Sequence, residues 1–205
     1  MNINGIISYY NNLSFLDLIK INELNINWTV YNKSGSPLGA QDLNYKEIMR
    51  ENVGRETETY LNHIISNYNN LSDYTLFIQD DVDEHLENYE SFLASCVDFA
   101  SDNKKFYIFP TSWRKNSPCI TRTMINGNHS IHTLPDNCIA KACKELNIDL
   151  PPVYITNTCA FFICHKDVIL KRSKVFYENA LDFLLQNELD HGFAFEHMWE
   201  IIFNF

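Results

Sequence analysis

Apolar residues in the first part of the chain follow the spacing of strands and of a short helix. Residues 5–10 form an apolar run and residues 26–31 an alternating one, and each ends in an Asn-containing turn, as strands often do. The leucines and the isoleucine between residues 13 and 19 permit a short helix. Residues 74–79 are apolar enough for a strand that is covered on both faces. The pattern predicts a β-α-β opening followed by a buried strand.

Two longer helices flank that buried strand. Between residues 55 and 68 apolar residues recur at three- and four-residue spacing with polar residues between them, which predicts an amphipathic helix. A second helix is predicted over residues 86–100. The remaining predicted elements are strands at residues 106–110 and 153–164 and helices within residues 166–205. Residues 111–150 form a long irregular part with one short helix around residues 137–146, and stretches of that size are usually functional or disordered.

Helices that alternate with strands predict one α/β domain over residues 1–205, with a mostly parallel central sheet flanked by helices. Such sheets bind ligands at the carboxyl ends of their strands. The functional site is therefore expected just after Tyr10, Tyr31, Gln79 or Pro110.

Charge narrows the classes of partner. The chain has 16 Lys and Arg against 26 Asp and Glu, a net charge of -10, so a broad surface for nucleic acid or an anionic membrane is not expected. Neither an apolar run of about 20 residues nor a secretory signal pattern occurs, which predicts a cytoplasmic protein without a membrane span. Six cysteines without a Cys-x-x-Cys pair are expected to be reduced and mostly buried. A phosphate-bearing ligand must then be held by a few residues or through a metal ion.

Three aspartates follow the predicted buried strand directly. Asp80, Asp81 and Asp83 precede a predicted helix, and carboxylates two residues apart around a turn can face one divalent cation such as Mg²⁺ or Mn²⁺, which in turn can bridge a diphosphate. The alternative is a solvated turn that caps the helix. We expect Asp81 and Asp83 as metal ligands and Asp80 beside the bound cofactor or donor.

Other candidates sit at the predicted strand ends and helix starts. Arg55 and Glu56 begin the amphipathic helix, where they would place a phosphate-binding cation and a hydroxyl-binding carboxylate together. The alternative is an ordinary helix entry with Glu56 near the positive end of the helix dipole. Tyr9 or Tyr10 would flank a nucleobase, and Lys33 would reach phosphate.

A late cluster gathers acids and imidazoles. Asp190, His191, Glu196 and His197 fall within eight residues and can serve as a general base or as an additional metal ligand. We expect Glu196 as the first candidate base, with Asp190 and His191 behind it, and His197 as the additional ligand. A helix cap with surface residues is the alternative.

Several blocks of the sequence resemble a known family. They are Tyr9-Tyr-Asn11, Val30-Tyr-Asn-Lys33, Asn52-Val-Gly-Arg-Glu56, Phe77-Ile-Gln79, Cys159 to His165 and Phe195 to Phe203, and together they resemble the domain-of-unknown-function family 3431. That family is similar to glycosyltransferases of the GT-A fold. The resemblance implies a Rossmann-like nucleotide-sugar-binding fold in which Arg55 and Glu56 contact the donor and Asp81 and Asp83 hold Mn²⁺ or Mg²⁺. It also implies a donor and metal half over residues 1–110 and an acceptor half over residues 111–205.

The resulting hypothesis is a metal-dependent hexosyl- or pentosyltransferase. It would move a sugar from a UDP- or GDP-sugar to a hydroxyl of a glycan, protein or small-molecule acceptor. Two alternatives stay open: a non-catalytic module that binds nucleotide sugars or carbohydrate, and a metal-dependent phosphohydrolase that uses the same aspartates to activate water.

Overall fold

A six-stranded sheet in the order β3-β2-β1-β4-β8-β5 forms the centre of the molecule. The computed structural model describes residues 1–21, 25–40, 42–109, 120–124, 138–149, 153–157 and 160–204. The strands of this sheet are β1 (Ile3–Tyr9), β2 (Ile26–Asn32), β3 (Tyr45–Met49), β4 (Tyr74–Gln79), β5 (Phe106–Ile108) and β8 (Phe162–His165). The strands β1, β2 and β4 are almost wholly buried, as expected for apolar strands covered on both faces.

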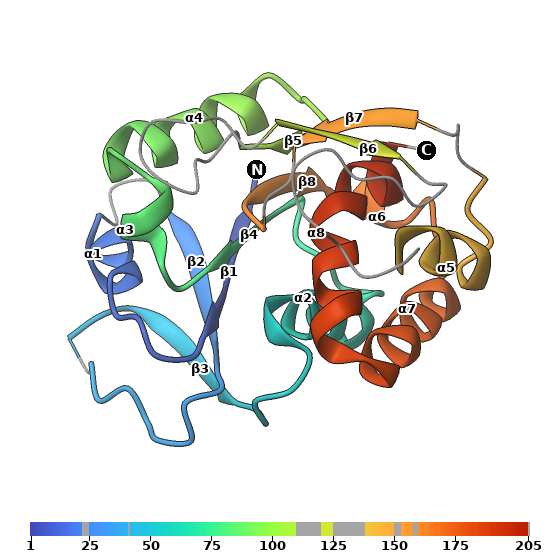
Figure 1. Ribbon diagram of the computed structural model, residues 1–205. Coiled ribbons are helices and arrows are strands. Elements are labelled where there is room, and N and C mark those ends of the chain that lie inside the picture. The colour runs from blue at the N-terminus through green and yellow to red at the C-terminus, as the bar shows by residue number, and fades with distance from the viewer. Residues whose placement is uncertain are drawn as a thin grey trace.

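Helices cover both faces of the sheet (Figure 1). On one side lie α2 (Arg55–Asn67), α7 (Lys174–Gln186) and α8 (Glu188–Asn204), and on the other α1 (Phe15–Lys20) and α4 (Tyr89–Ser101). The shorter helices are α3 (Val82–His85), α5 (Cys138–Glu145) and α6 (Lys166–Ile169). A separate antiparallel pair consists of β6 (Ile120–Met124) and β7 (Val153–Asn157). Among the described residues, no helix has the length and apolarity that a membrane span requires.

Aromatic side chains join the sheet to the helices α2 and α8. Trp199 of α8 lies with its ring centroid 5.2 Å from that of Phe162 on β8 and 6.0 Å from that of Tyr60 on α2. Tyr60 also contacts Phe77 of β4, and its hydroxyl donates a hydrogen bond to the carbonyl of Ala160 at 2.9 Å. These contacts fix α8 against the N-terminal half of the sheet, so residues far apart in the sequence share one core.

The prediction of a mostly parallel sheet was wrong. β1 pairs in parallel with β2 and β4, and β2 with β3, but β8 runs antiparallel to both β4 and β5. Residues 153–164, which resemble one strand by composition, divide between β7 and β8 in different sheets. Phe162 enters opposite Phe77 near the carboxyl end of β4, and His165 ends opposite Tyr74. Because β8 enters the sheet at the carboxyl end of β4, it runs antiparallel to β4.

Other predicted elements are confirmed. The amphipathic helix, the buried strand and the short helix after residue 137 correspond to α2, β4 and α5. The strands β3 and β6 were not predicted. The α/β class and the flanking helices are therefore as expected, whereas the direction of one strand and the second small sheet are not.

Gly5 offers a test of the packing between the two central strands. It lies opposite Trp28 in the β1–β2 register, and a Cβ atom added there would come within 2.2 Å of the Trp28 ring. We expect Gly5→Ala to lower the free energy of unfolding by about 1–3 kcal/mol through overpacking. Urea denaturation measures the change. Asn4→Ala, at the adjacent position, is the control and should stay within about 0.5 kcal/mol of wild type. An equal midpoint for Gly5→Ala and wild type would contradict this account.

Candidate functional site

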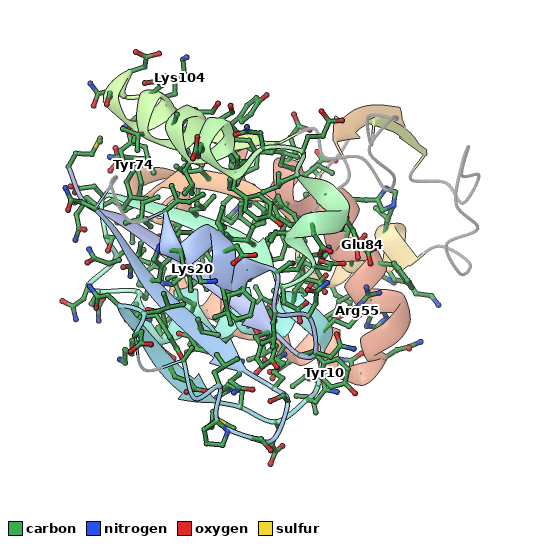
Figure 2. The ribbon with its side chains drawn as sticks, turned by 90° about the vertical axis from the view of Figure 1, so that its left-hand side faces the viewer. Tyr10, Lys20, Arg55, Tyr74, Glu84 and Lys104 are labelled. Carbon is green, nitrogen blue, oxygen red and sulfur yellow. The ribbon has the colours of Figure 1, made fainter. Side chains whose placement is uncertain are left out.

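A cavity of about 410 Å³ lies at the carboxyl ends of β1, β2 and β4. Tyr10, Lys33 and Asp81 line it from the segments that follow these three strands. In Figure 2, Tyr10, Arg55 and Glu84 lie at one end of the molecule, whereas Tyr74, which begins β4, lies toward the other. The predicted positions after Tyr10, Tyr31 and Gln79 thus meet in one place. The position after Pro110 lies outside the described residues.

A buried lysine shapes the start of α2 beside this cavity. Lys33 Nζ donates hydrogen bonds to the carbonyl oxygens of Val53 at 2.7 Å and Arg55 at 2.5 Å, and pairs with Glu58 Oε2 at 2.7 Å. An ammonium group has three N–H donors, so these partners use all of them. Burial lowers the pKa of Lys33, and the Glu58 carboxylate partly offsets that effect. Lys33 was expected to reach phosphate, but its side chain holds the protein's own backbone instead.

The backbone at this helix start is left-handed. Gly54 has a φ of 60° and Arg55 a φ of 53°, a region that side-chain-bearing residues seldom adopt. A Cβ atom at Gly54 would lie 2.6 Å from Glu58 Cβ, so glycine is required there on two grounds. The hydrogen bond from Lys33 to the Arg55 carbonyl helps to hold this conformation. Strained residues held by their surroundings occur often at functional sites.

The Arg55 guanidinium lies between α2 and α8. Its Nη2 is 3.7 Å from Glu196 Oε1, its Nε is 3.6 Å from Glu56 Oε2, and its Cζ lies 4.5 Å from the ring centroid of Phe193. The side chain is 38% exposed and lines the cavity, so it remains accessible to a ligand. Both predicted members of the Arg-Glu pair therefore lie at the cavity.

Three carboxylates from different elements surround the same space. Glu56 comes from α2, Asp81 from the turn after β4, and Glu196 from α8. Within the described residues, Glu56 Oε1 and Asp81 Oδ1 are buried without a hydrogen-bond partner. Burial, with the nearby Glu56, raises the pKa of Glu196 to about 8 against the opposing effect of Arg55. Burial also raises the pKa of Glu56. The cavity therefore favours a proton or a cation.

The three predicted aspartates have different surroundings. Asp80 Oδ2 accepts hydrogen bonds from the backbone N–H groups of Tyr10, Asn11 and Asn12 at 2.8–2.9 Å, and so fastens the turn after β1 to the end of β4. Asp83 is exposed, accepts a hydrogen bond from the Asn12 amide at 3.0 Å and does not line the cavity. Asp81 alone of the expected metal pair lines it. α3 begins between the two, at Val82, and separates their directions.

Only one of the two tyrosines faces the cavity. Tyr9 is buried and packs on Phe15 with the ring centroids 5.3 Å apart, whereas Tyr10 is half exposed and lines the cavity. Successive residues of a strand point to opposite faces, which explains the difference. Tyr9 therefore belongs to the core, and Tyr10 remains the candidate for a nucleobase contact.

The late cluster is divided in the same way. His191 is buried and stacks on Phe183 with the ring centroids 3.8 Å apart. Its Nδ1 lies 2.5 Å from the Phe183 carbonyl oxygen. His197 is buried and does not line the cavity, because consecutive helix residues point about 100° apart and Glu196 takes that direction. Asp190 lies in α8, and its side chain is outside the described residues. Of this cluster the structure thus brings Glu196 to the cavity.

His85 and Gln79 are among the lining residues that were not predicted. His85 Nε2 lies 2.7 Å from Gln79 Nε2 and 3.4 Å from Asp81 Oδ2, while His85 Nδ1 is buried without a partner among the described residues. The four-residue spacing of Asp81 and His85 at a helix start was the available signal. Gln79 is the last residue of β4, the end at which a parallel strand presents its ligand contacts.

The cavity residues suit a metal ion that is bound together with a substrate, but not one that is bound by protein side chains alone. Among the described residues, no three His, Cys, Asp or Glu side chains form a group that could hold a metal ion by themselves. Mg²⁺, however, is usually bound through one or two carboxylates together with phosphate oxygens of the substrate. Asp81, with its unpartnered buried oxygen, fits that second arrangement.

The raised pKa of Glu196 predicts how stability depends on pH. The folded state keeps a proton that the unfolded state releases between pH 4.5 and about 8, so the free energy of unfolding should fall as pH rises through that window. Glu196→Gln removes this contribution, and its stability relative to wild type should increase by a few kcal/mol across the window.

Urea denaturation of both proteins at the two ends of the window measures this change. Glu178→Gln on α7, where the side chain is 45% exposed, is the matched control and should run parallel to wild type. A Glu196→Gln curve that also runs parallel to wild type would show that the carboxyl titrates normally.

A comparison with known proteins adds one match. The model of the family described as Protein of unknown function (DUF3431) matches residues 16–205, nearly the whole chain. No curated protein and no solved structure matches the chain. The match covers all the residues that line the cavity except those of the first strand and the turn after it.

Proposed function

We propose that this chain, which belongs to the family described as Protein of unknown function (DUF3431), is a glycosyltransferase that uses a nucleoside diphosphate sugar as its donor. The observation that carries the proposal is the cavity in which Arg55 meets the carboxylates of Glu56, Asp81 and Glu196. The acceptor would be a hydroxyl group of a glycan, a protein or a small molecule.

The position of the cavity supports a nucleotide ligand. The parallel strands run in the order β3-β2-β1-β4, so the strand order reverses between β1 and β4. Open α/β sheets bind nucleotides at the carboxyl ends of the strands at such a point. Tyr10 after β1 and Asp81 after β4 lie on its two sides, and the GT-A fold expected from the resemblance would place its donor there.

The charge of the cavity supports a donor that binds together with a cation. Its described lining contains five acidic residues, Glu56, Asp80, Asp81, Glu84 and Glu196, against Lys33 and Arg55. Lys33 is fully engaged, so Arg55 is left to face a diphosphate. A diphosphate would meet net repulsion unless a divalent cation is present. We propose that Asp81 holds Mn²⁺ or Mg²⁺ together with the phosphate oxygens of the donor.

The reaction would break the bond between the anomeric carbon and the diphosphate oxygen and form a bond from the same carbon to the acceptor oxygen. The bound cation would neutralise charge on the leaving diphosphate, and Arg55 would add to this stabilisation. In a transfer that inverts configuration, Glu196 would take the proton of the acceptor hydroxyl. Its pKa of about 8 suits a group that exchanges a proton near neutral pH.

Thermal unfolding with UDP- and GDP-sugars, with and without Mn²⁺, tests the donor site. We expect stabilisation only when donor and metal are both present, by about 2.7 kcal/mol at a hundredfold excess over Kd, or roughly 5–10 °C in Tm. Asp81→Asn should abolish the shift because it weakens the cation ligand. Asp83→Asn, two residues away and outside the cavity, should retain it.

Each outcome has a definite reading. Stabilisation that ignores both Mn²⁺ and Asp81 would refute the proposed donor site. Donor binding without transfer or donor hydrolysis would indicate a binding module. Cleavage of phosphate esters that carry no sugar would indicate a phosphohydrolase. Under the proposal, Glu196→Gln should keep donor binding and lose transfer if the reaction inverts configuration.

A further inference from the structure

A second cavity, of about 440 Å³, lies where α2 crosses the sheet beside its edge strand β3. It shares no lining residue with the first cavity. The register places Asn4 opposite Asn27 and Lys46 opposite Thr29, so these side chains project from one face of three neighbouring strands. His63 and Asn67, four residues apart on α2, complete the wall. We call this space the β3 groove.

His63 lines the β3 groove and is held by hydrogen bonds to its neighbours. Its side chain is 4% exposed, and its Nδ1 lies 3.0 Å from the Tyr31 hydroxyl and 3.4 Å from the Asn67 amide nitrogen. Burial lowers the pKa of His63 to about 4, so the ring is neutral at pH 7, and burial raises the pKa of Tyr31 to about 12, so the phenol keeps its proton. The Asn67 amide nitrogen can only donate, so Nδ1 is the acceptor of that hydrogen bond and the ring proton resides on Nε2. In the described part of the chain, Nε2 has no partner.

The asparagine side chains that line the β3 groove beside the strands, Asn4, Asn27 and Asn44, are uncharged and keep unpaired hydrogen-bonding atoms among the described residues. Asn27 uses its amide nitrogen to donate to Asn2 Oδ1 at 2.7 Å, which leaves its own oxygen as an acceptor. The side chains of Asn4 and Asn44 have no hydrogen bond to the described residues. None of the described lining residues is acidic, although the chain has a net charge of -10, and exposed Lys46 is the one charged residue among them.

These groups match the chemistry of a sugar better than that of an ion. A saccharide hydroxyl both donates and accepts, so it can satisfy the His63 N–H and the asparagine amides together. Ile48 is partly buried and lies two residues after Lys46 on the same face of β3, where it supplies apolar surface for the C–H face of a sugar ring. We propose that the β3 groove is a second binding site, for a neutral saccharide, where His63 Nε2–H and the asparagine amides contact ligand hydroxyls. The proposal does not depend on the function assigned to the first cavity.

Nuclear magnetic resonance of the full chain labelled with ¹⁵N tests this site. The probes are neutral oligosaccharides, namely maltotriose, cellotriose, xylotriose and triacetylchitotriose, each titrated alone. We expect saturable shifts of the His63 Nε2 resonance and of the asparagine amides of the β3 groove with at least one probe. Asn27→Trp fills the groove from an exposed strand position and should weaken this binding by at least about tenfold. Ser101→Trp, at the exposed end of α4, is the matched control and should bind as wild type does.

Other results of these titrations would contradict the proposal. No saturable shift with any probe, or binding that survives Asn27→Trp, would refute the proposal. Acetate or phosphate that shifts His63 through Lys46, with no response to the sugars, would make the β3 groove an anion site and refute it as well. Retention of sugar binding in Asp81→Asn separates this result from the donor site, because Asp81 belongs to the first cavity.

Discussion

The buried ammonium of Lys33 is the interaction on which the candidate site depends. It reaches from the end of β2 to the start of α2 and binds two backbone carbonyls and the Glu58 carboxylate. Removing one partner of such a buried pair leaves an uncompensated charge, which is among the more costly changes a fold can suffer. The left-handed backbone of Gly54 and Arg55 is held by this contact. The orientation of the Arg55 side chain therefore depends on Lys33, although Lys33 has no N–H donor left for a ligand.

Arg55 in turn links two helices that are distant in sequence. Its position between Glu56 and Glu196 offsets part of the mutual repulsion of the three carboxylates, but does not remove it. The aromatic contacts of Trp199 hold α8 in place, so the carboxylates cannot separate freely. The folding energy thus offsets the repulsion between these carboxylates, and their closeness favours the binding of a cation or a proton.

Local patterns predicted most of the elements, but not which of the candidate side chains lie together. The helix after residue 55 follows from the spacing of its apolar residues, and the strand at residues 74–79 from its continuous apolar run. The reversed direction of β8 depends on where the chain re-enters the sheet, which no local pattern records. We expected Lys33 to reach phosphate because its neighbours in the sequence do not show that Val53, Arg55 and Glu58 surround its ammonium group. Asp81 and Asp83 share a spacing but not a cavity, because α3 begins between them.

The reversed strand also has a consequence for the order in which the protein can fold. β8 lies between β4 and β5, and within the described residues β5 has no other strand partner. During synthesis, β5 leaves the ribosome well before β8 and has no sheet to join until residues 162–165 arrive. Pairing of segments so far apart in sequence is slow, and unpaired strand edges promote aggregation while it is incomplete. Until β8 pairs with it, the edge of β4 therefore leaves backbone N–H and C=O groups unpaired in a nascent chain.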